Sequence, residues 1–158
     1  MTDRDEIMSL IGSLAVGVDG RRWDDVLDLF ASQVEVDYSS LFGGEPQYIT
    51  REQLIANWRQ LVPGFTHTTH LIGLPAIIVN GASAEASASV VAWHMLKDEA
   101  VAGKDLWLVG GTYEFAFSKE EARWRIAGLT LARAWSDGNQ DLPRLAALRA
   151  SHATTMPG

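Results

Sequence analysis

Three side chains in this sequence have the types and spacing that proton transfer requires. Two histidines, His70 in T-H-T-T-H-L-I-G and His94 in V-V-A-W-H-M-L, lie inside segments typical of β-strands. An aspartate, Asp19 in A-V-G-V-D-G-R-R-W, stands at the end of an apolar helical stripe. A carboxylate beside an imidazole can fix its tautomer and stabilise its charged form. An imidazole on a sheet, opposite a carboxylate on a helix, therefore indicates proton transfer in an apolar cavity.

The N-terminal part of the chain is predicted to be helical and to carry Asp19. Apolar residues recur at spacings of three and four over 7–18, which predicts an amphipathic helix that stops at Asp19 and the glycine after it. A second short helix is predicted over 23–30, and alternation predicts a strand over 34–38 that ends in a glycine-containing loop. A capping box begins a third helix over 50–61. Three helices thus precede the main sheet.

After Phe65 the apolar residues alternate, which is typical of strands. The predicted strands run over about 66–72, 75–80, 84–97, 105–118 and 123–136. The last three are long enough to form one strongly curved antiparallel sheet. We therefore expect an α+β fold: a cone-shaped, curved, mixed or antiparallel sheet with three N-terminal helices that enclose an apolar pocket. The expected division is a cone domain over 1–140 and a C-terminal helix or tail over 141–158.

Alternation along the strands predicts which side chains enter the cone. His94 shares a face with small and aliphatic residues, whereas Trp93 lies on the opposite face. The consecutive glycines Gly110 and Gly111 suggest a bulge or a close backbone approach. Arg133 shares the face of Leu129, which places it at the pocket rim.

Composition excludes several classes of function. The chain has 158 residues, no cysteine and a net charge of -7. Disulfides and cysteine metal sites are therefore excluded, and nucleic acid is not an expected partner. No stretch approaches the roughly 20 apolar residues of a membrane span, and the N-terminus lacks the features of a signal peptide, so a cytoplasmic protein without a membrane partner is expected. His67 and His70 point to opposite faces of a strand, so no metal site is expected.

A family resemblance covers nearly the whole chain, from about residue 5 to residue 137. Six segments, taken in their order, resemble the SnoaL-like family of the nuclear transport factor 2-like superfamily. They are V-D-G-R-R-W, V-D-Y-S-S, T-T-H-L-I-G, the W-H of a long strand, G-G-T-Y and W-R-I-A-G. The pattern is closest to that of scytalone dehydratase, and G-V-D and T-T-H also resemble lindane dehydrochlorinase. The resemblance implies a cone fold, an enclosed site for a hydrophobic small molecule, no metal or organic cofactor, and elimination or isomerisation through proton abstraction.

The resemblance also implies roles for four catalytic residues. Asp19 and His70 would form a dyad in which His70 is the base. Tyr38 would present a hydroxyl to the substrate, and His94 would protonate a leaving hydroxyl or hold water. One departure is Val18, where the scytalone dehydratase pattern has a tyrosine.

Further residues are expected to bind the substrate, and others to form an interface between subunits. The expected substrate-binding residues are Trp23, Trp58, Tyr113, Leu129 and Arg133. The outer face of the sheet, with Val91 and Trp93, is a candidate surface for a homodimer or homotrimer. A hydrophobic small molecule is the expected ligand.

Other interpretations of the same residues remain open. His70 could be a core histidine bonded to a backbone carbonyl, and Asp19 could be a helix-end residue. The favoured function is a cofactor-free dehydratase or isomerase acting on a hydrophobic cyclic or polyketide-like carbonyl compound. The alternatives are a noncatalytic module that binds hydrophobic ligands and a structural small subunit of a ring-hydroxylating dioxygenase.

Overall fold

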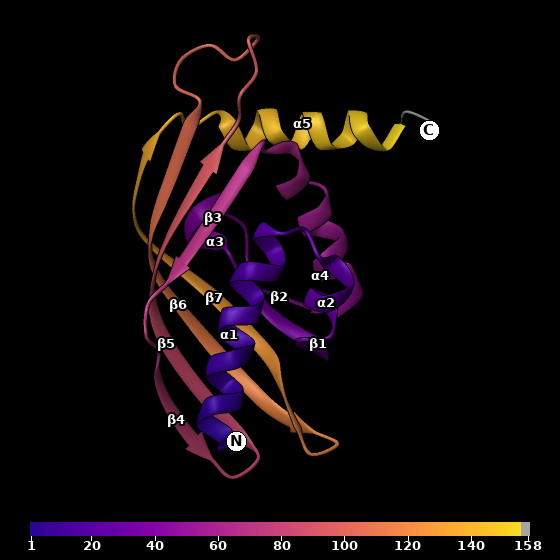
Figure 1. The fold of residues 1–158 in the computed structure, drawn as a ribbon, viewed down its shortest axis with the longest axis vertical. Coiled ribbons are helices and arrows are strands. Elements are labelled where there is room, and N and C mark those ends of the chain that lie inside the picture. The colour runs from indigo at the N-terminus through magenta and orange to yellow at the C-terminus, as the bar shows by residue number, and fades with distance from the viewer. Residues whose placement is uncertain (156–158) are drawn as a thin grey trace.

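The computed structural model describes residues 1–155 and shows one curved sheet whose concave side holds the helices (Figure 1). The helices are α1 (Asp3–Asp19), α2 (Trp23–Leu27), α3 (Ser39–Phe42), α4 (Arg51–Arg59) and α5 (Leu142–Thr155), with a 3-10 turn η1 (Val62–Gly64). The strands are β1 (Phe30–Asp37), β2 (Gln47–Thr50), β3 (His67–Ile72), β4 (Ala76–Asn80), β5 (Ser83–Met95), β6 (Leu106–Glu120) and β7 (Arg123–Gly138).

The sheet is mixed and does not close into a barrel. Its strand order is β2-β1-β7-β6-β5-β3, and β4 pairs with the first half of β5. All neighbours are antiparallel except β1 and β7, which run parallel. β3 pairs only with β5, so it is an edge strand beside α1. The predicted fold class, an α+β cone with a curved sheet, is confirmed.

The first helix brings Asp19 to this edge. A capping box between Thr2 and Asp5 begins α1, and its buried stripe packs into the concave side of the sheet. The helix ends at Asp19, with Gly20 as its C-cap in an ordinary helical conformation. Arg21 takes the left-handed conformation, with φ of 53°. Its guanidinium donates a hydrogen bond of 2.6 Å to the carbonyl oxygen of Phe65. The end of α1 is thereby fixed against the segment that leads into β3.

The prediction for residues 23–50 is wrong in detail. The second helix ends at Leu27, and Phe30 already belongs to β1. The strand stops at Asp37, whose carboxylate accepts bonds from the backbone N and the hydroxyl of Ser39, at 2.9 and 2.6 Å, and so turns the chain into α3. Tyr38 is therefore the N-cap of α3 and not a strand residue. Alternation also gave no sign of the four-residue strand β2.

The consecutive glycines of β6 lie opposite a bulge in β7. Gly110 pairs with Trp135 and Gly111 with Arg133, so the ladder skips one residue of β7. A Cβ atom on Gly110 would lie 2.1 Å from the Trp135 ring, so that ring covers the glycine. Both expected features, a bulge and a close approach, occur at this point.

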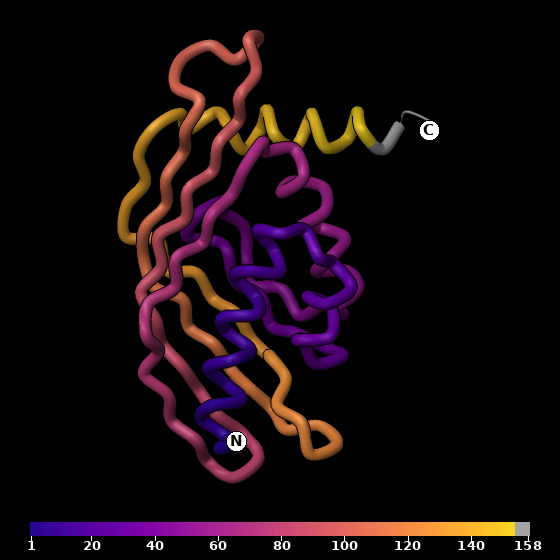
Figure 2. Tube along the Cα trace, in the orientation of Figure 1, coloured from indigo at the N-terminus to yellow at the C-terminus, as the bar shows by residue number. Residues whose placement is uncertain are grey.

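The last helix, α5, packs against η1 at one end of the sheet. Figure 2 shows the chain beginning near the β4–β5 turn and α5 leaving the opposite end. A Cβ atom on Gly64 of η1 would lie 1.7 Å from the carbonyl oxygen of Ala146, so the backbones of η1 and α5 touch. The expected C-terminal helix or tail over 141–158 corresponds to α5, and residues 156–158 lie outside the described residues.

Candidate functional site

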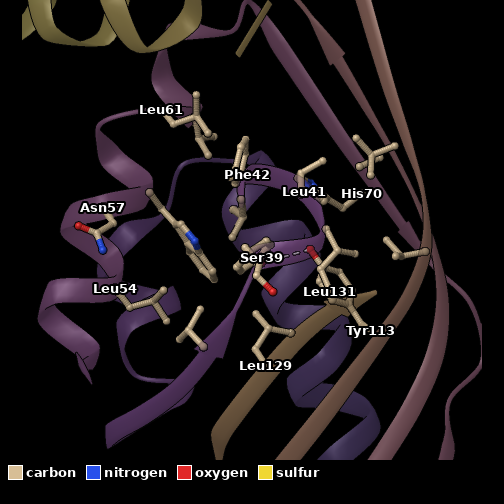
Figure 3. Close-up of a pocket in the computed structure, with 18 of the residues that line it drawn as sticks. Ser39, Leu41, Phe42, Leu54, Asn57, Leu61, His70, Tyr113, Leu129 and Leu131 are labelled. Carbon is tan, nitrogen blue, oxygen red and sulfur yellow. Dashed lines mark hydrogen bonds between the residues drawn. The ribbon is translucent and has the colours of Figure 1, made fainter. Parts of the chain in front are cut away.

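A cavity of about 360 Å³ lies between the helices and the concave face of the sheet. Figure 3 shows its walls, with Leu54 and Asn57 on the α4 side and His70 and Tyr113 on the sheet side. Most lining side chains are apolar, among them Leu14, Val18, Leu54, Trp58, Phe65, Val90, Trp107, Val109, Leu129 and Leu131. The exposed lining residues Phe42, Glu45, Gln47 and Asn57 mark its mouth. Such a volume is near the lower end of small-molecule pockets, roughly 300 to 1,000 Å³.

Asp19 and His70 meet at the wall formed by α1 and β3. Asp19 Oδ1 lies 2.7 Å from His70 Nδ1 and accepts a 2.9 Å bond from the Thr68 hydroxyl. Asp19 Oδ2 accepts a 2.7 Å bond from the backbone N–H of His70. That N–H is free to bond Asp19 because β3 is an edge strand. The carboxylate thus receives bonds from three donors on two residues of one strand.

These contacts fix how protons are distributed. Burial raises the pKa of Asp19, but the hydrogen bonds from His70 and Thr68 outweigh it, so the pKa lies below its ordinary value and the group is a carboxylate at neutral pH. The negative end of the α1 dipole also opposes this charge. A carboxylate can only accept hydrogen bonds, so Nδ1 of His70 carries the proton. Nε2 of neutral His70 is therefore unprotonated and can act as a base.

The second histidine of the cavity has different surroundings. His94 is 9% exposed, its Nδ1 lies 3.3 Å from the carbonyl oxygen of Trp107, and its ring packs 4.4 Å from the Trp107 ring. Burial, with His70 beside it, lowers the pKa of His94 to about 4. His94 is therefore neutral at pH 7, with Nδ1–H facing the carbonyl and Nε2 available as an acceptor.

Two phenols form a polar pair within the cavity wall. The hydroxyl groups of Tyr38 and Tyr113 lie 3.4 Å apart. Burial raises the pKa of Tyr38 well above its usual value and also raises the pKa of Tyr113. Both phenols therefore keep their protons and can donate hydrogen bonds. Because only one proton is needed between the two hydroxyls, the other can be donated to a bound molecule.

The structure brings most of the expected site residues together. His70, Tyr38, His94, Trp58, Tyr113 and Leu129 line the cavity, and Asp19 supports His70 from behind. Trp23 does not line it, because α2 packs against α1 and α4 and holds this side chain against the core. Arg133 is exposed and does not line it either. The Ser40 hydroxyl of α3 donates to the carbonyl of Leu131 and accepts from the N–H of Arg133, so α3 packs on the backbone of β7 at this point.

Sequence reasoning missed three residues that contribute to this site. Thr68 is 5% exposed and bonds Asp19, and its place two residues before His70 in T-T-H could have shown that both share a face. Trp107 and Phe65 form the aromatic wall around His94, with Phe65 5.0 Å from the imidazole. No local pattern pointed to Phe65, because its role depends on how η1 returns the chain to the sheet.

Two features are absent from the described part of the chain. Residues 1–155 contain no group of three or more His, Cys, Asp or Glu side chains placed to hold a metal ion. Within the same residues no helix is long and apolar enough to cross a membrane.

Comparisons with known proteins place the fold in a family. A family model described as a SnoaL-like domain matches residues 1–130. No curated protein sequence matches the chain. The Kfla4162 protein of Kribbella flavida is 28% identical, with a TM-score of 0.85, and the match covers 90% of this chain and 97% of that one.

Two more distant structures share the fold. A Novosphingobium aromaticivorans protein provisionally described as a scytalone dehydratase is 18% identical, with a TM-score of 0.70 and coverage of 88% and 92%. A nuclear transport factor 2-like superfamily protein of Salmonella enterica is 17% identical, with a TM-score of 0.68 and coverage of 82% and 89%.

Proposed function

The chain belongs to the SnoaL-like family, and on that basis we propose that it is a cofactor-free lyase that dehydrates a hydrophobic cyclic β-hydroxy carbonyl compound. The observation that carries the proposal is the bond between Asp19 and His70, which leaves Nε2 of His70 unprotonated in an apolar cavity. The description of one structural relative as a scytalone dehydratase is consistent with this chemistry.

In the proposed reaction, Nε2 of His70 takes the proton from the carbon next to the carbonyl. The electron pair moves into the carbonyl to form an enolate, and Asp19 stabilises the imidazolium. One hydroxyl of the Tyr38–Tyr113 pair donates to the enolate oxygen, where negative charge develops. Burial raises the pKa of each hydroxyl, so both stay protonated and can donate a hydrogen bond to the enolate oxygen without ionising.

The second half of the reaction needs an acid. The enolate re-forms the carbonyl, the carbon–carbon double bond forms, and the bond from the β-carbon to its hydroxyl breaks. His94 does not supply the proton at neutral pH, because its pKa is about 4 and its Nδ1–H faces Trp107. The imidazolium of His70 then returns its proton to the leaving hydroxyl, and water is released. His94 instead accepts a bond from that hydroxyl or from water through Nε2.

A hydrogen-exchange experiment tests the first step without knowledge of the natural substrate. α-Tetralone, a bicyclic ketone, is incubated with the protein in D₂O, and exchange at the carbon next to the carbonyl is followed by NMR. We expect exchange above the buffer rate, lost in His70→Asn. A β-hydroxy tetralone then tests elimination, because loss of water gives a naphthol with a strong ultraviolet absorbance. Neither exchange nor elimination, with tight ligand binding retained, would support a noncatalytic module instead.

A further inference from the structure

One buried hydroxyl beside Asp19 has no part in the proposed reaction steps. Thr68 is 5% exposed, so its hydroxyl lies in the buried core. Its hydroxyl donates a hydrogen bond of 2.9 Å to Asp19 Oδ1. The same oxygen accepts the 2.7 Å hydrogen bond from His70 Nδ1. Thr68 does not line the cavity. A role in binding the substrate is therefore excluded by position.

The geometry of β3 explains why this hydroxyl reaches Asp19. Residues two apart in a strand share a face, so Thr68 and His70 both turn toward the end of α1. The backbone N–H of His70 holds the second carboxylate oxygen at 2.7 Å. Three points of attachment on one short stretch of strand fix the carboxylate plane, which a two-point attachment would leave free to tilt. The imidazole of His70 is bonded to one oxygen of the carboxylate, so the orientation of the carboxylate sets the orientation of the ring.

We infer that Thr68 is a positioning residue: it aims the Asp19 carboxylate so that Asp19 in turn holds His70 with Nε2 directed at the cavity. Through the same bond Thr68 helps to keep Asp19 ionised at the negative end of the α1 dipole. The inference rests on the proposed function only for its effect on turnover. Its effect on Asp19 stands on geometry alone.

The test compares Thr68→Val with Thr68→Ser. Valine keeps the shape and suits a strand but lacks the hydroxyl, whereas serine keeps the hydroxyl and lacks the methyl group. The hydrogen bond from Thr68 lowers the pKa of Asp19, so this pKa should rise in the valine variant and stay near the wild-type value in the serine variant. A ¹³C NMR titration of the labelled carboxyl measures this without any substrate. Thr68→Ala replaces Thr68→Val if the valine variant does not fold.

Turnover of the β-hydroxy tetralone supplies the second readout. For Thr68→Val we expect kcat to fall about 10- to 100-fold, the factor of one hydrogen bond to a charged group, with KM unchanged because Thr68 does not contact the cavity. The serine variant should recover most of kcat. The inference is overturned if Asp19 titrates alike in wild type and Thr68→Val, or if serine behaves like valine. A raised pKa of Asp19 in a protein that turns over no ketone would support the role of Thr68 and overturn the proposed function.

Discussion

The ring centroids of the two cavity histidines lie 5.6 Å apart. Their hydrogen-bond partners nevertheless differ, because His70 lies at the edge of the sheet and His94 in its middle. At the edge, β3 has a free N–H that helps to hold Asp19, and His70 gains a charged partner. In the middle, β5 has neighbours on both sides, and the Nδ1 of His94 is left with a 3.3 Å contact to the carbonyl of Trp107. The free edge of β3 thus gives His70 a charged partner, whereas burial keeps His94 neutral.

The substitution with the largest expected effect on turnover is Asp19→Asn, which removes the charged partner of His70. An amide can satisfy the site best if its oxygen accepts from the backbone N–H of His70 and its NH₂ donates to Thr68 and to His70 Nδ1. That arrangement moves the ring proton to Nε2 and removes the base. We expect kcat to fall about 10,000-fold with ligand binding retained, as judged from steady-state kinetics and calorimetric titration.

Imidazole ¹⁵N NMR gives the matched control for this variant. The wild type should show His70 protonated at Nδ1 and the asparagine variant should show it protonated at Nε2, while His94 stays protonated at Nδ1 in both. Wild-type turnover in Asp19→Asn would remove the carboxylate from the mechanism.

A smaller effect, on folding, is expected from His94. The pKa of His94 is about 4 in the folded protein, against 6.5 ordinarily, so the unfolded chain binds the proton first as the pH falls. The free energy of unfolding should therefore decrease as the pH falls from 6.5 to 4, by about 3 kcal/mol from this group. Urea unfolding of wild type and His94→Gln across this range measures the difference, which should be absent in the glutamine variant.

Asp19 affects the free energy of unfolding over a lower pH range than His94, so the contributions of the two residues can be measured separately. Its pKa is lowered from 3.8, so the stability it contributes is complete above pH 3.8 and is lost as the pH falls through the folded-state value. A pH dependence of unfolding between 6.5 and 4 that persists unchanged in His94→Gln would show that His94 is not the buried neutral group.

The sequence predicted the strands better than the short elements between them. Alternation over long segments identified β5, β6 and β7 within a few residues, because one face of each is buried against the helices. The four-residue elements α3 and β2 are too short to show a period. α3 depends on the turn in which Asp37 bonds Ser39, a local signal that the alternation over 34–38 hid, and β2 depends on its pairing with β1, which no local pattern shows.

The candidate site was predictable where one element alone decides a residue's place. The end of an apolar helical stripe located Asp19, and strand alternation located His94. The neutral state of His94 was not predictable, because burial by Phe65 and Trp107 comes from distant segments. The position of Arg133 was not predictable either, since it depends on how α3 packs on β7 through Ser40.

A moderate effect is expected at the phenol pair, which extends the comparison beyond the histidines. Tyr113→Phe removes one of two hydroxyls that lie 3.4 Å apart. The remaining Tyr38 hydroxyl can still donate to the enolate oxygen but loses its fixed direction, so we expect kcat to fall about 10-fold, roughly the value of one hydrogen bond. Tyr38→Phe is the matched variant, and an equal loss in both would indicate that the pair acts as a unit. No loss in either would exclude the phenols from stabilising the enolate.

The smallest effect is expected at Arg133, which lies outside the cavity. Its side chain is exposed and its backbone N–H bonds Ser40, a contact that does not depend on the side chain. Arg133→Ala should therefore leave kcat and KM within about twofold of wild type and change stability by no more than about 0.5 kcal/mol, as is usual for surface substitutions. Kinetics on the β-hydroxy tetralone and urea unfolding measure both. A KM raised tenfold or more would mean that Arg133 reaches the bound substrate, and that the mouth of the cavity includes this end of β7 when a ligand is present.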